Sequence, residues 1–292
     1  MRVLDVAAPL GALVSRMLGD LGAEVIKIEP PGADPGRHLA PFLTTGRERL
    51  SLPFVHANVN KRSVLLDLEQ RQDQEHFRAL AAQADVVVST EGLATWAARG
   101  VDVERLPTLY PRLIWTSFSP FGLRGPYSAY TGNNIVSEAM GGLMYIQGDD
   151  AKPPCVSPCE QGLYLASLHA ACGTLMALWE RRASGLGQVV EVSVHEVLAN
   201  LYFLLVNYGL RSDMPYRMGA RNFMPPNGYY RCKDGHVFIA ALQTRQWDRL
   251  VELVTTPGSR MPPYGMRTIA TSTQNWWCRC SRSSRRALMA GH

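Results

Sequence analysis

Residues 2–29, RVLDVAAPLGALVSRMLGDLGAEVIKIE, contain two short runs of β-type residues on either side of a helical pattern. The runs at 2–6 and 24–28 are rich in valine, isoleucine and leucine, which favours strands. Between them, apolar residues recur at the spacing of one helix face, at Leu10, Leu13, Val14, Met17, Leu18 and Leu21. A strand, a helix and a second strand in so short a stretch predict two parallel strands joined by a helix.

The same alternation continues along the chain. Four further strands are predicted, at residues 63–68, 85–88, 112–116 and 189–192. Three further helices are predicted, at residues 70–82, 163–182 and 194–210. The helix at 163–182 is stopped by the glycines of Ser184-Gly185-Leu186-Gly187. This order predicts an α/β fold with a Rossmann-like parallel sheet flanked by helices.

We expect three parts in the chain. Residues 1–210 form a large domain, and residues 211–255 form a linker and the start of a smaller second domain. In that second part the turn Asp234-Gly235 opens into a strand at 236–241, and a helix follows at 247–254. Residues 256–292 form an atypical basic tail.

The tail differs from the rest in composition. From Met261 to His292 it has no acidic residue and five arginines, Arg267, Arg279, Arg282, Arg285 and Arg286, which account for the whole formal net charge of +5. Two interpretations stay open, a truncated or frameshifted end and a genuine divergent tail. A basic tail can bind nucleic acid, but we favour a poorly ordered end and expect no nucleic-acid partner.

Composition excludes several classes of protein. Apolar residues make up 46% of the chain and charged residues 19%, which predicts a folded core rather than disorder. No run of 18 apolar residues and no signal peptide is visible, so we expect no membrane segment and a cytoplasmic location. The cysteine pairs Cys155-x3-Cys159 and Cys278-x-Cys280 have no second pair or histidines at zinc-site spacing, so we expect no metal.

The first strand-to-helix turn contains one glycine, Gly11. Glu29 ends the second strand, where nicotinamide-binding proteins place an acid for the ribose. Their fingerprint needs three glycines in the turn, however, so a nicotinamide cofactor is not predicted.

Two other segments are candidate phosphate or ligand contacts. Lys61 and Arg62 precede a predicted strand, where two adjacent cations can meet phosphate groups, although a solvated loop explains them equally well. The loop with Phe121, Gly122 and Gly125 follows a buried strand, and its glycines let the backbone approach a ligand closely. Residues 30–60 carry many turn-forming residues and are predicted to be a long functional loop.

No Ser/His/Asp arrangement is visible. His169 lies within an apolar helix, where a core histidine is the simpler interpretation. Glu160 lies near the start of the long helix, where the helix dipole favours a negative charge.

Together these segments resemble family III CoA-transferases, the carnitine-CoA-transferase-like and formyl-CoA transferase superfamily. The resemblance covers about residues 2–254 and rests on the opening stretch and on NKRSVLLDL, ADVVVST, YPRLIWTSFSPFGLRGPY and LHAACGTLMALWERRASGLGQVVEVSVHEVLANL, in the family's order. It implies transfer of CoA between an acyl-CoA thioester and a carboxylate, coenzyme A as part of the substrate, and interlocked chains in a homodimer or a heteromer.

The resemblance also implies roles for single residues. The family's nucleophilic aspartate lies ten residues before the glycine that is Gly173 here, and that position holds Leu163. Glu160 is the nearest substitute. Arg99 replaces an arginine that is usual near position 98. The residues expected to bind coenzyme A are Gly11, Lys61, Arg62, Arg99, Phe121, Gly122 and Gly125. Without the aspartate, two alternatives to an active enzyme stay open: a non-catalytic partner subunit of a heteromeric CoA-transferase, or a truncated inactive homologue.

Overall fold

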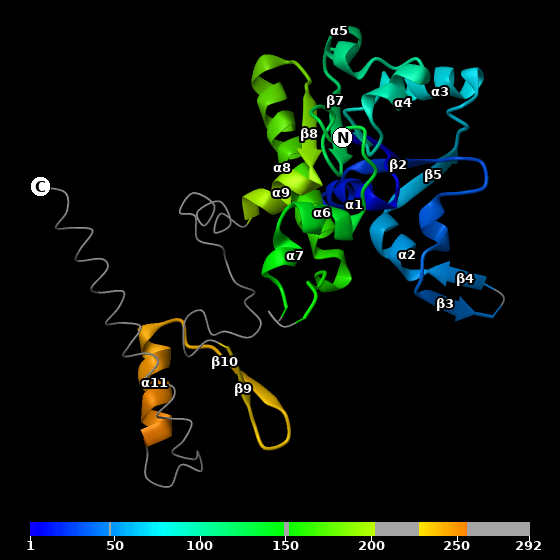
Figure 1. Ribbon diagram of the computed structural model, residues 1–292. Coiled ribbons are helices and arrows are strands. Elements are labelled where there is room, and N and C mark those ends of the chain that lie inside the picture. The colour runs from blue at the N-terminus through cyan, green and yellow to red at the C-terminus, as the bar shows by residue number, and fades with distance from the viewer. Residues whose placement is uncertain (47, 149–151, 202–227, 256–292) are drawn as a thin grey trace, which may run out of the picture. The chain divides into compact units, whose positions relative to one another are not determined.

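The computed structural model describes residues 1–46, 48–148, 152–201 and 228–255. The chain forms two compact units, the larger from residues 1–145 and 155–215, the smaller from residues 146–154 and 216–292. Figure 1 shows the sheet and most helices in the larger unit. The tail predicted at 256–292 lies outside the described residues.

The larger unit contains a six-stranded sheet in which every neighbouring pair is parallel. Its strands are β1 (Arg2–Val6), β2 (Glu24–Glu29), β5 (Lys61–Leu65), β6 (Val86–Ser89), β7 (Ile114–Ser119) and β8 (Val189–Ser193). Their order across the sheet is β5-β2-β1-β6-β7-β8. Counted along the chain this is 3-2-1-4-5-6, the doubly wound Rossmann order, so the predicted fold class is confirmed.

One face of the sheet carries a hydrophobic core cluster. Here α3 (Arg71–Ala81), α4 (Leu93–Ala98), η3 (Val103–Arg105) and α5 (Leu106–Leu109) follow one another along the chain. Trp96 lies at the centre, stacked on Phe77 at 5.2 Å between ring centroids and edge-on to Trp115 at 4.9 Å. Such aromatic pairs stabilise a core beyond the area that they bury.

The other face is covered by α1 (Ala12–Asp20), after η1 (Pro9–Gly11), and by the long α8 (Gln161–Ser184). The buried positions of α8 are mostly small, such as Ala166, Ala170 and Ala177, which lets the helix lie close to the strands. Gly185 ends the helix at φ 78°, a left-handed conformation that glycine adopts without strain. By length and composition residues 158–184 could cross a membrane, but 44% of the most apolar window is buried inside this fold.

Residues 30–60 are more ordered than predicted. They contain η2 (Pro35–His38), the hairpin of β3 (Phe42–Thr45) and β4 (Glu48–Ser51), and α2 (Leu52–Asn58). The prediction of one long loop is therefore wrong. The Ser51 hydroxyl accepts a hydrogen bond from the Phe54 N–H, and Pro53 lies in the first turn of α2, so a capped helix start was present in the sequence.

The remaining described elements are short. In the larger unit they are α6 (Asn134–Met140), α7 (Leu143–Ile146, which extends one residue beyond it), η4 (Pro158–Glu160) and α9 (Val194–Leu201). The smaller unit contains an antiparallel hairpin of β9 (Gly228–Arg231) and β10 (His236–Ile239), followed by α11 (Thr244–Thr255). The helix predicted at 194–210 is confirmed up to residue 201, and the rest lies outside the described residues.

Candidate functional site: a pocket at the start of α8

A pocket of about 170 Å³ lies beside the N-terminal turn of α8, between η1, α1, η2 and α2. Much of its lining is apolar and comes from Pro9, Leu13, Leu39, Pro53, Phe54 and Leu163. Its polar side chains are those of Asp34, His56, Asn58, Glu160 and Tyr164. An apolar hollow with a few convergent polar groups is the usual form of a small-molecule site.

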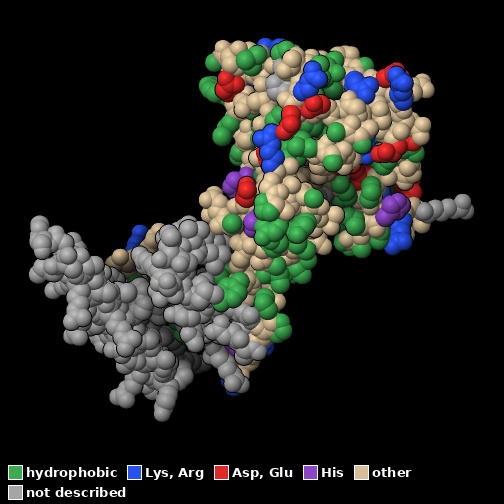
Figure 2. Space-filling model, turned by 45° about the horizontal axis from the view of Figure 1, so that its top comes forward, with side chains coloured by type: hydrophobic (Ala, Val, Ile, Leu, Met, Phe, Trp, Pro, Cys, Tyr) green, Lys and Arg blue, Asp and Glu red, His purple; other side chains and the backbone are tan. Residues whose placement is uncertain are grey.

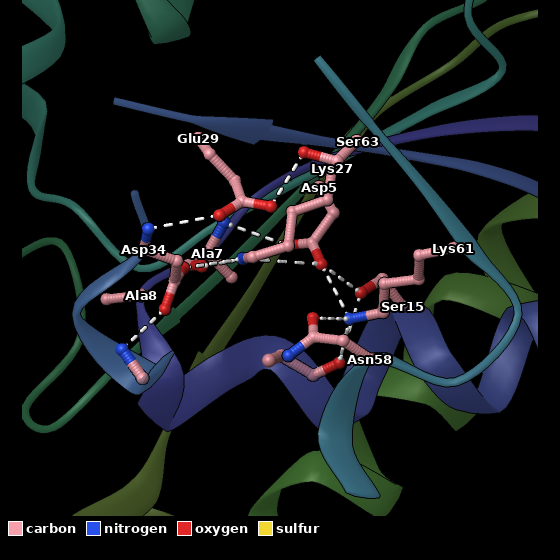
Figure 3. Close-up of polar contacts among 12 residues, drawn as sticks. Asp5, Ala7, Ala8, Ser15, Lys27, Glu29, Asp34, Asn58, Lys61 and Ser63 are labelled. Atoms are coloured by element: carbon pink, nitrogen blue, oxygen red, sulfur yellow. Dashed lines mark hydrogen bonds and ion pairs between the residues drawn. The ribbon is translucent and has the colours of Figure 1, made fainter. Parts of the chain in front are cut away.

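Buried charges hold one wall of this pocket (Figure 3). The Nζ of Lys61 lies 2.7 Å from Oδ2 of Asp5, 2.7 Å from the carbonyl oxygen of Ala12 and 2.8 Å from Oδ1 of Asn58. The side chains of Lys61 and Asp5 are 2% and 0% exposed. Burial lowers the pKa of the Lys61 ammonium, and the Asp5 carboxylate opposes that shift. Lys61 thereby joins β1, β5 and α1 to Asn58 at the end of α2.

A second buried lysine, Lys27, joins the same network. The Nζ of Lys27 lies 2.8 Å from Oδ2 of Asp34, donates to the carbonyl oxygen of Ala7 at 3.0 Å and lies 3.9 Å from Asp5. Asp34 in turn accepts from the Gly36 N–H at 2.6 Å. A buried carboxylate is stable only when it is paired in this way. The ion pair of Asp34 with Lys27 therefore holds the loop before η2 in place.

Glu29 completes the network. Its carboxylate binds the Arg37 guanidinium through two hydrogen bonds of 2.7 Å and also accepts from the Ser63 hydroxyl at 2.6 Å and the Asp34 N–H at 3.0 Å. The hydrogen bond from Arg37 is the main reason that the pKa of Glu29 falls to about 2. The Glu29 carboxylate, at the end of β2, is thus hydrogen-bonded to other residues of this chain.

The start of α8 has an unusual backbone. Cys159 and Glu160 have φ values of 57° and 52°, a left-handed conformation that is uncommon for residues with a side chain. The first turn of the helix is capped from another element, since Oδ1 of Asn134 accepts from the Leu163 N–H at 3.2 Å. The buried Glu138 accepts from the Asn134 amide at 2.8 Å. Leu163 and Glu160 are therefore held at the pocket by the backbone.

Two side chains far apart in the sequence meet at the pocket. The Tyr164 hydroxyl lies 3.0 Å from Nε2 of His56. Nη1 of Arg16, in α1, lies 3.0 Å from Nδ1 and 3.2 Å from Nε2 of the same ring, and it also donates to the His56 carbonyl oxygen.

The structure does not gather the predicted contact residues at this pocket. Lys61 is buried, and its three N–H donors already have three oxygen partners, while Arg62 is 79% exposed and bound to Glu24 at 3.0 Å. Both residues lie inside β5 rather than before it. Gly11 is buried, and a Cβ there would lie 2.5 Å from the Thr90 methyl group. A glycine is therefore needed at this position for packing. Binding of coenzyme A by Gly11, Lys61 and Arg62 stays a prediction.

The other predicted contacts lie elsewhere on the larger unit. Arg99 is paired with Glu69 at 2.8 Å and with Glu91. Phe121 is buried, and Gly122 and Gly125 have φ values of 85° and 101°. The Leu123 N–H donates a hydrogen bond to the Glu191 carboxylate at 2.6 Å, which holds the loop against β8. Leu123 and Arg124 also line a separate pocket of about 250 Å³. Of the residues predicted as functional, only Glu160 lines the pocket at the start of α8.

Sequence reasoning missed His56, Asn58 and Tyr164. The first two lie on α2, in the segment predicted to be loop, although the capped start at Ser51 and Pro53 was a usable signal. No local sequence pattern indicates Tyr164, because its partner is 108 residues away in the chain.

Figure 2 shows acidic and basic side chains interspersed over the visible face of the larger unit.

The doubly wound sheet, with a pocket built from the loops and helices around β1 and β2, defines an α/β protein with a candidate small-molecule site. Residues 1–274 match the model of CoA-transferase family III. The chain therefore belongs to CoA-transferase family III.

Similar proteins include two named as subunits of larger enzymes. The succinyl-CoA:(R)-benzylsuccinate CoA-transferase subunit BbsE of Thauera aromatica is 32% identical over 250 residues, which cover 85% of this chain and 60% of that protein. The succinyl-CoA–L-malate CoA-transferase alpha subunit of Chloroflexus aurantiacus is 33% identical over 267 residues, which cover 89% of this chain and 62% of that protein. The chain thus spans about three fifths of the length of these relatives.

Solved structures confirm the fold. A CAIB/BAIF family protein from Brucella suis superposes with a TM-score of 0.77 at 30% sequence identity, over 87% of this chain and 68% of that one. Rv3272 from Mycobacterium tuberculosis gives a TM-score of 0.76 at 29% identity, over 88% and 68%.

Proposed function

We propose that this chain takes part in the transfer of CoA from an acyl-CoA thioester to a carboxylate acceptor. Membership of CoA-transferase family III supports the reaction class. The observation that carries the proposal is the pocket at the start of α8, which both Leu163 and Glu160 line. The acyl group and the acceptor are not identified by these observations.

The reaction needs a carboxylate that attacks the thioester carbonyl, displaces the CoA thiolate and carries the acyl group as a mixed anhydride. Resemblance to the family puts that carboxylate at the position of Leu163, which is 6% exposed and has no nucleophilic atom. Asp34 is already bound to Lys27 and the Gly36 N–H. Glu160 is exposed at the pocket, and it is the substitute available for covalent catalysis.

We propose further that the chain works as the non-catalytic subunit of a two-chain CoA-transferase. Two observations support this form over catalysis by Glu160. A leucine occupies the expected nucleophile position, and Glu160 precedes it by three residues, so its carboxylate approaches a different point of the pocket. Two of the relatives are themselves named as subunits.

An assay of the purified chain, alone and mixed with a family paralogue that has the aspartate, tests the proposal. Succinyl-CoA serves as donor, and succinate, malate and benzylsuccinate serve as acceptors. We expect no turnover by this chain alone, and turnover by the mixture above that of the paralogue. Turnover by this chain alone that Glu160→Gln abolishes would replace the subunit proposal with catalysis by Glu160. A folded chain that neither binds CoA nor changes the paralogue would overturn both.

A further inference from the structure

The outward side of α8 carries a continuous apolar stripe. It consists of Leu168, Cys172, Leu175, Met176 and Trp179, which recur at helical spacing and therefore share one side of the helix. All five are exposed, and Met176 and Trp179 are 69% and 73% exposed. Large apolar side chains gathered in this way on a surface mark an interaction site more often than chance.

The charged side chains of α8 lie only at its two ends. Residues 161–179 contain no aspartate, glutamate, lysine or arginine. The charged residues are Glu160 before the helix, and Glu180, Arg181 and Arg182 near its end. Arg181 is engaged in an ion pair with Asp85 at 2.8 Å. Arg182 is exposed and follows Leu175 by seven residues, so it continues the apolar stripe with a positive charge.

The apolar part of this pattern matches itself when a second α8 lies antiparallel to the first. Cys172 lies at the middle of the helix, which runs from residue 161 to residue 184. With the two copies of Cys172 facing each other, Leu168 faces Met176 of the second copy. In the same register Leu165 faces Trp179 of the second copy. Each large side chain therefore meets an apolar side chain.

The same arrangement also satisfies the charges. In an antiparallel pair each Arg182 approaches the first turn of the other helix, where Glu160 lies. Opposite charges then meet at both ends, and the positive end of each helix dipole lies beside the negative end of the other. A membrane surface would cover the apolar stripe, but the basic residues that bind anionic lipid flank only one end of it. The charge pattern therefore favours a second copy of the chain.

We propose that α8 is a docking surface for a second copy of this chain, through a two-fold antiparallel contact centred on Cys172. Helices that pack side by side have axes roughly 8–10 Å apart, and the small Cys172 side chain at the centre allows such an approach. Met176 and Trp179 supply the large buried side chains of the contact. The contact needs no coenzyme A, so it is independent of the proposed function.

Sedimentation equilibrium of the full chain over a range of concentrations tests the proposal. We expect a monomer–dimer equilibrium. Met176→Glu should raise its dissociation constant by about tenfold or more, because the two-fold contact would bury two unpaired carboxylates. Leu109→Glu is the matched control, since this exposed leucine ends α5 on the opposite face of the sheet, and it should leave the equilibrium unchanged. Circular dichroism checks that both variants are folded.

Charge exchange and cross-linking test the antiparallel register. Arg182→Glu should weaken the dimer, and adding Glu160→Arg should restore most of the lost affinity. Oxidation with copper–phenanthroline should join two chains through a Cys172–Cys172 disulfide, identified by peptide mass mapping, because facing Cα atoms lie within the roughly 4–7 Å that a disulfide spans. Cys172→Ser should prevent this cross-link.

Three results would overturn the proposal. The first is a folded chain that stays monomeric over the whole concentration range. The second is a dimer that survives Met176→Glu and forms no Cys172 disulfide, which would show that the copies meet at another surface. The third is binding to phosphatidylcholine vesicles that Met176→Glu abolishes, without dimerisation, which would assign this side of α8 to a membrane. Each of these results leaves the proposed function standing, because none involves coenzyme A.

Discussion

The ammonium group of Lys61 lies 2.7 Å from the carboxylate of Asp5, and neither side chain is more than 2% exposed. The pair joins β5 to β1 across β2 and, through Asn58, reaches the pocket at the start of α8. A lysine that sequence reasoning assigns to phosphate binding is therefore part of the interior, with a structural partner on each of its donors.

Replacing Lys61 with methionine should destabilise the larger unit by about 3–5 kcal/mol, because it removes the closest cation from a buried carboxylate. Urea unfolding of the full chain measures the change. The neighbouring Arg62→Met is the matched control and should cost less than about 1 kcal/mol, since its ion pair with Glu24 is exposed. Equal costs for the two variants would contradict the buried-pair assignment.

The free energy of unfolding should fall as the pH is lowered from the ordinary pKa of Glu29, 4.5, to its folded value of about 2. Well above the ordinary pKa of 4.5 this carboxylate is ionised in both the folded and the unfolded chain, and its stabilisation is complete. Below that, the unfolded chain takes up a proton while the folded chain, with a pKa of about 2, does not. The loss should reach on the order of 3 kcal/mol by about pH 2.

Urea unfolding at a series of pH values measures this loss. Glu29→Gln should flatten the curve in that window, whereas Glu24→Gln, on the same strand but more exposed, should leave most of the slope. A slope unchanged by Glu29→Gln would show that other carboxylates set the acid sensitivity.

Gly187→Ala should destabilise the larger unit by about 3 kcal/mol or more. A Cβ at this position would lie 2.0 Å from the Leu113 carbonyl oxygen, and the Gly187 N–H donates to Pro111 at 2.6 Å. Both neighbours are backbone beside the sheet, so neither can move aside cheaply. Thermal unfolding compares it with Gly92→Ala, where a Cβ meets nothing within 4 Å and the cost should stay below about 1 kcal/mol.

Leu163→Asp should create or raise CoA-transfer activity if the rest of the catalytic site is intact. The new carboxylate would take the position at which the family's nucleophile is expected, in a pocket that this residue already lines. Trapping with hydroxylamine should then detect an activated acyl–enzyme intermediate. Leu163→Asn, which has the same shape without a nucleophilic carboxylate, is the control and should give no trapped product. A folded aspartate variant that binds acyl-CoA without turnover would favour the subunit role.

Local patterns in the sequence were enough to predict the α/β fold. The strand at Arg2–Val6, the long α8 and its stop at Gly185 follow from residue spacing and from glycine's conformational freedom, which depend on neighbours within a few positions. Segments with weaker local signals were misjudged. The start of α2 at Ser51 and Pro53 was overlooked among many turn-forming residues, and β5 begins two residues earlier than predicted, at Lys61.

Only the tertiary structure decided what the functional side chains touch. Lys61 and Asp5 are 56 residues apart in the sequence, and Tyr164 and His56 are 108 apart, so no local period relates them. Sheet order and helix packing bring each pair together. The local sequence around Lys61 is therefore compatible with a surface cation, whereas in the fold Lys61 is a buried structural cation. The long-range placement of its neighbours determines whether the ammonium group meets solvent or a carboxylate.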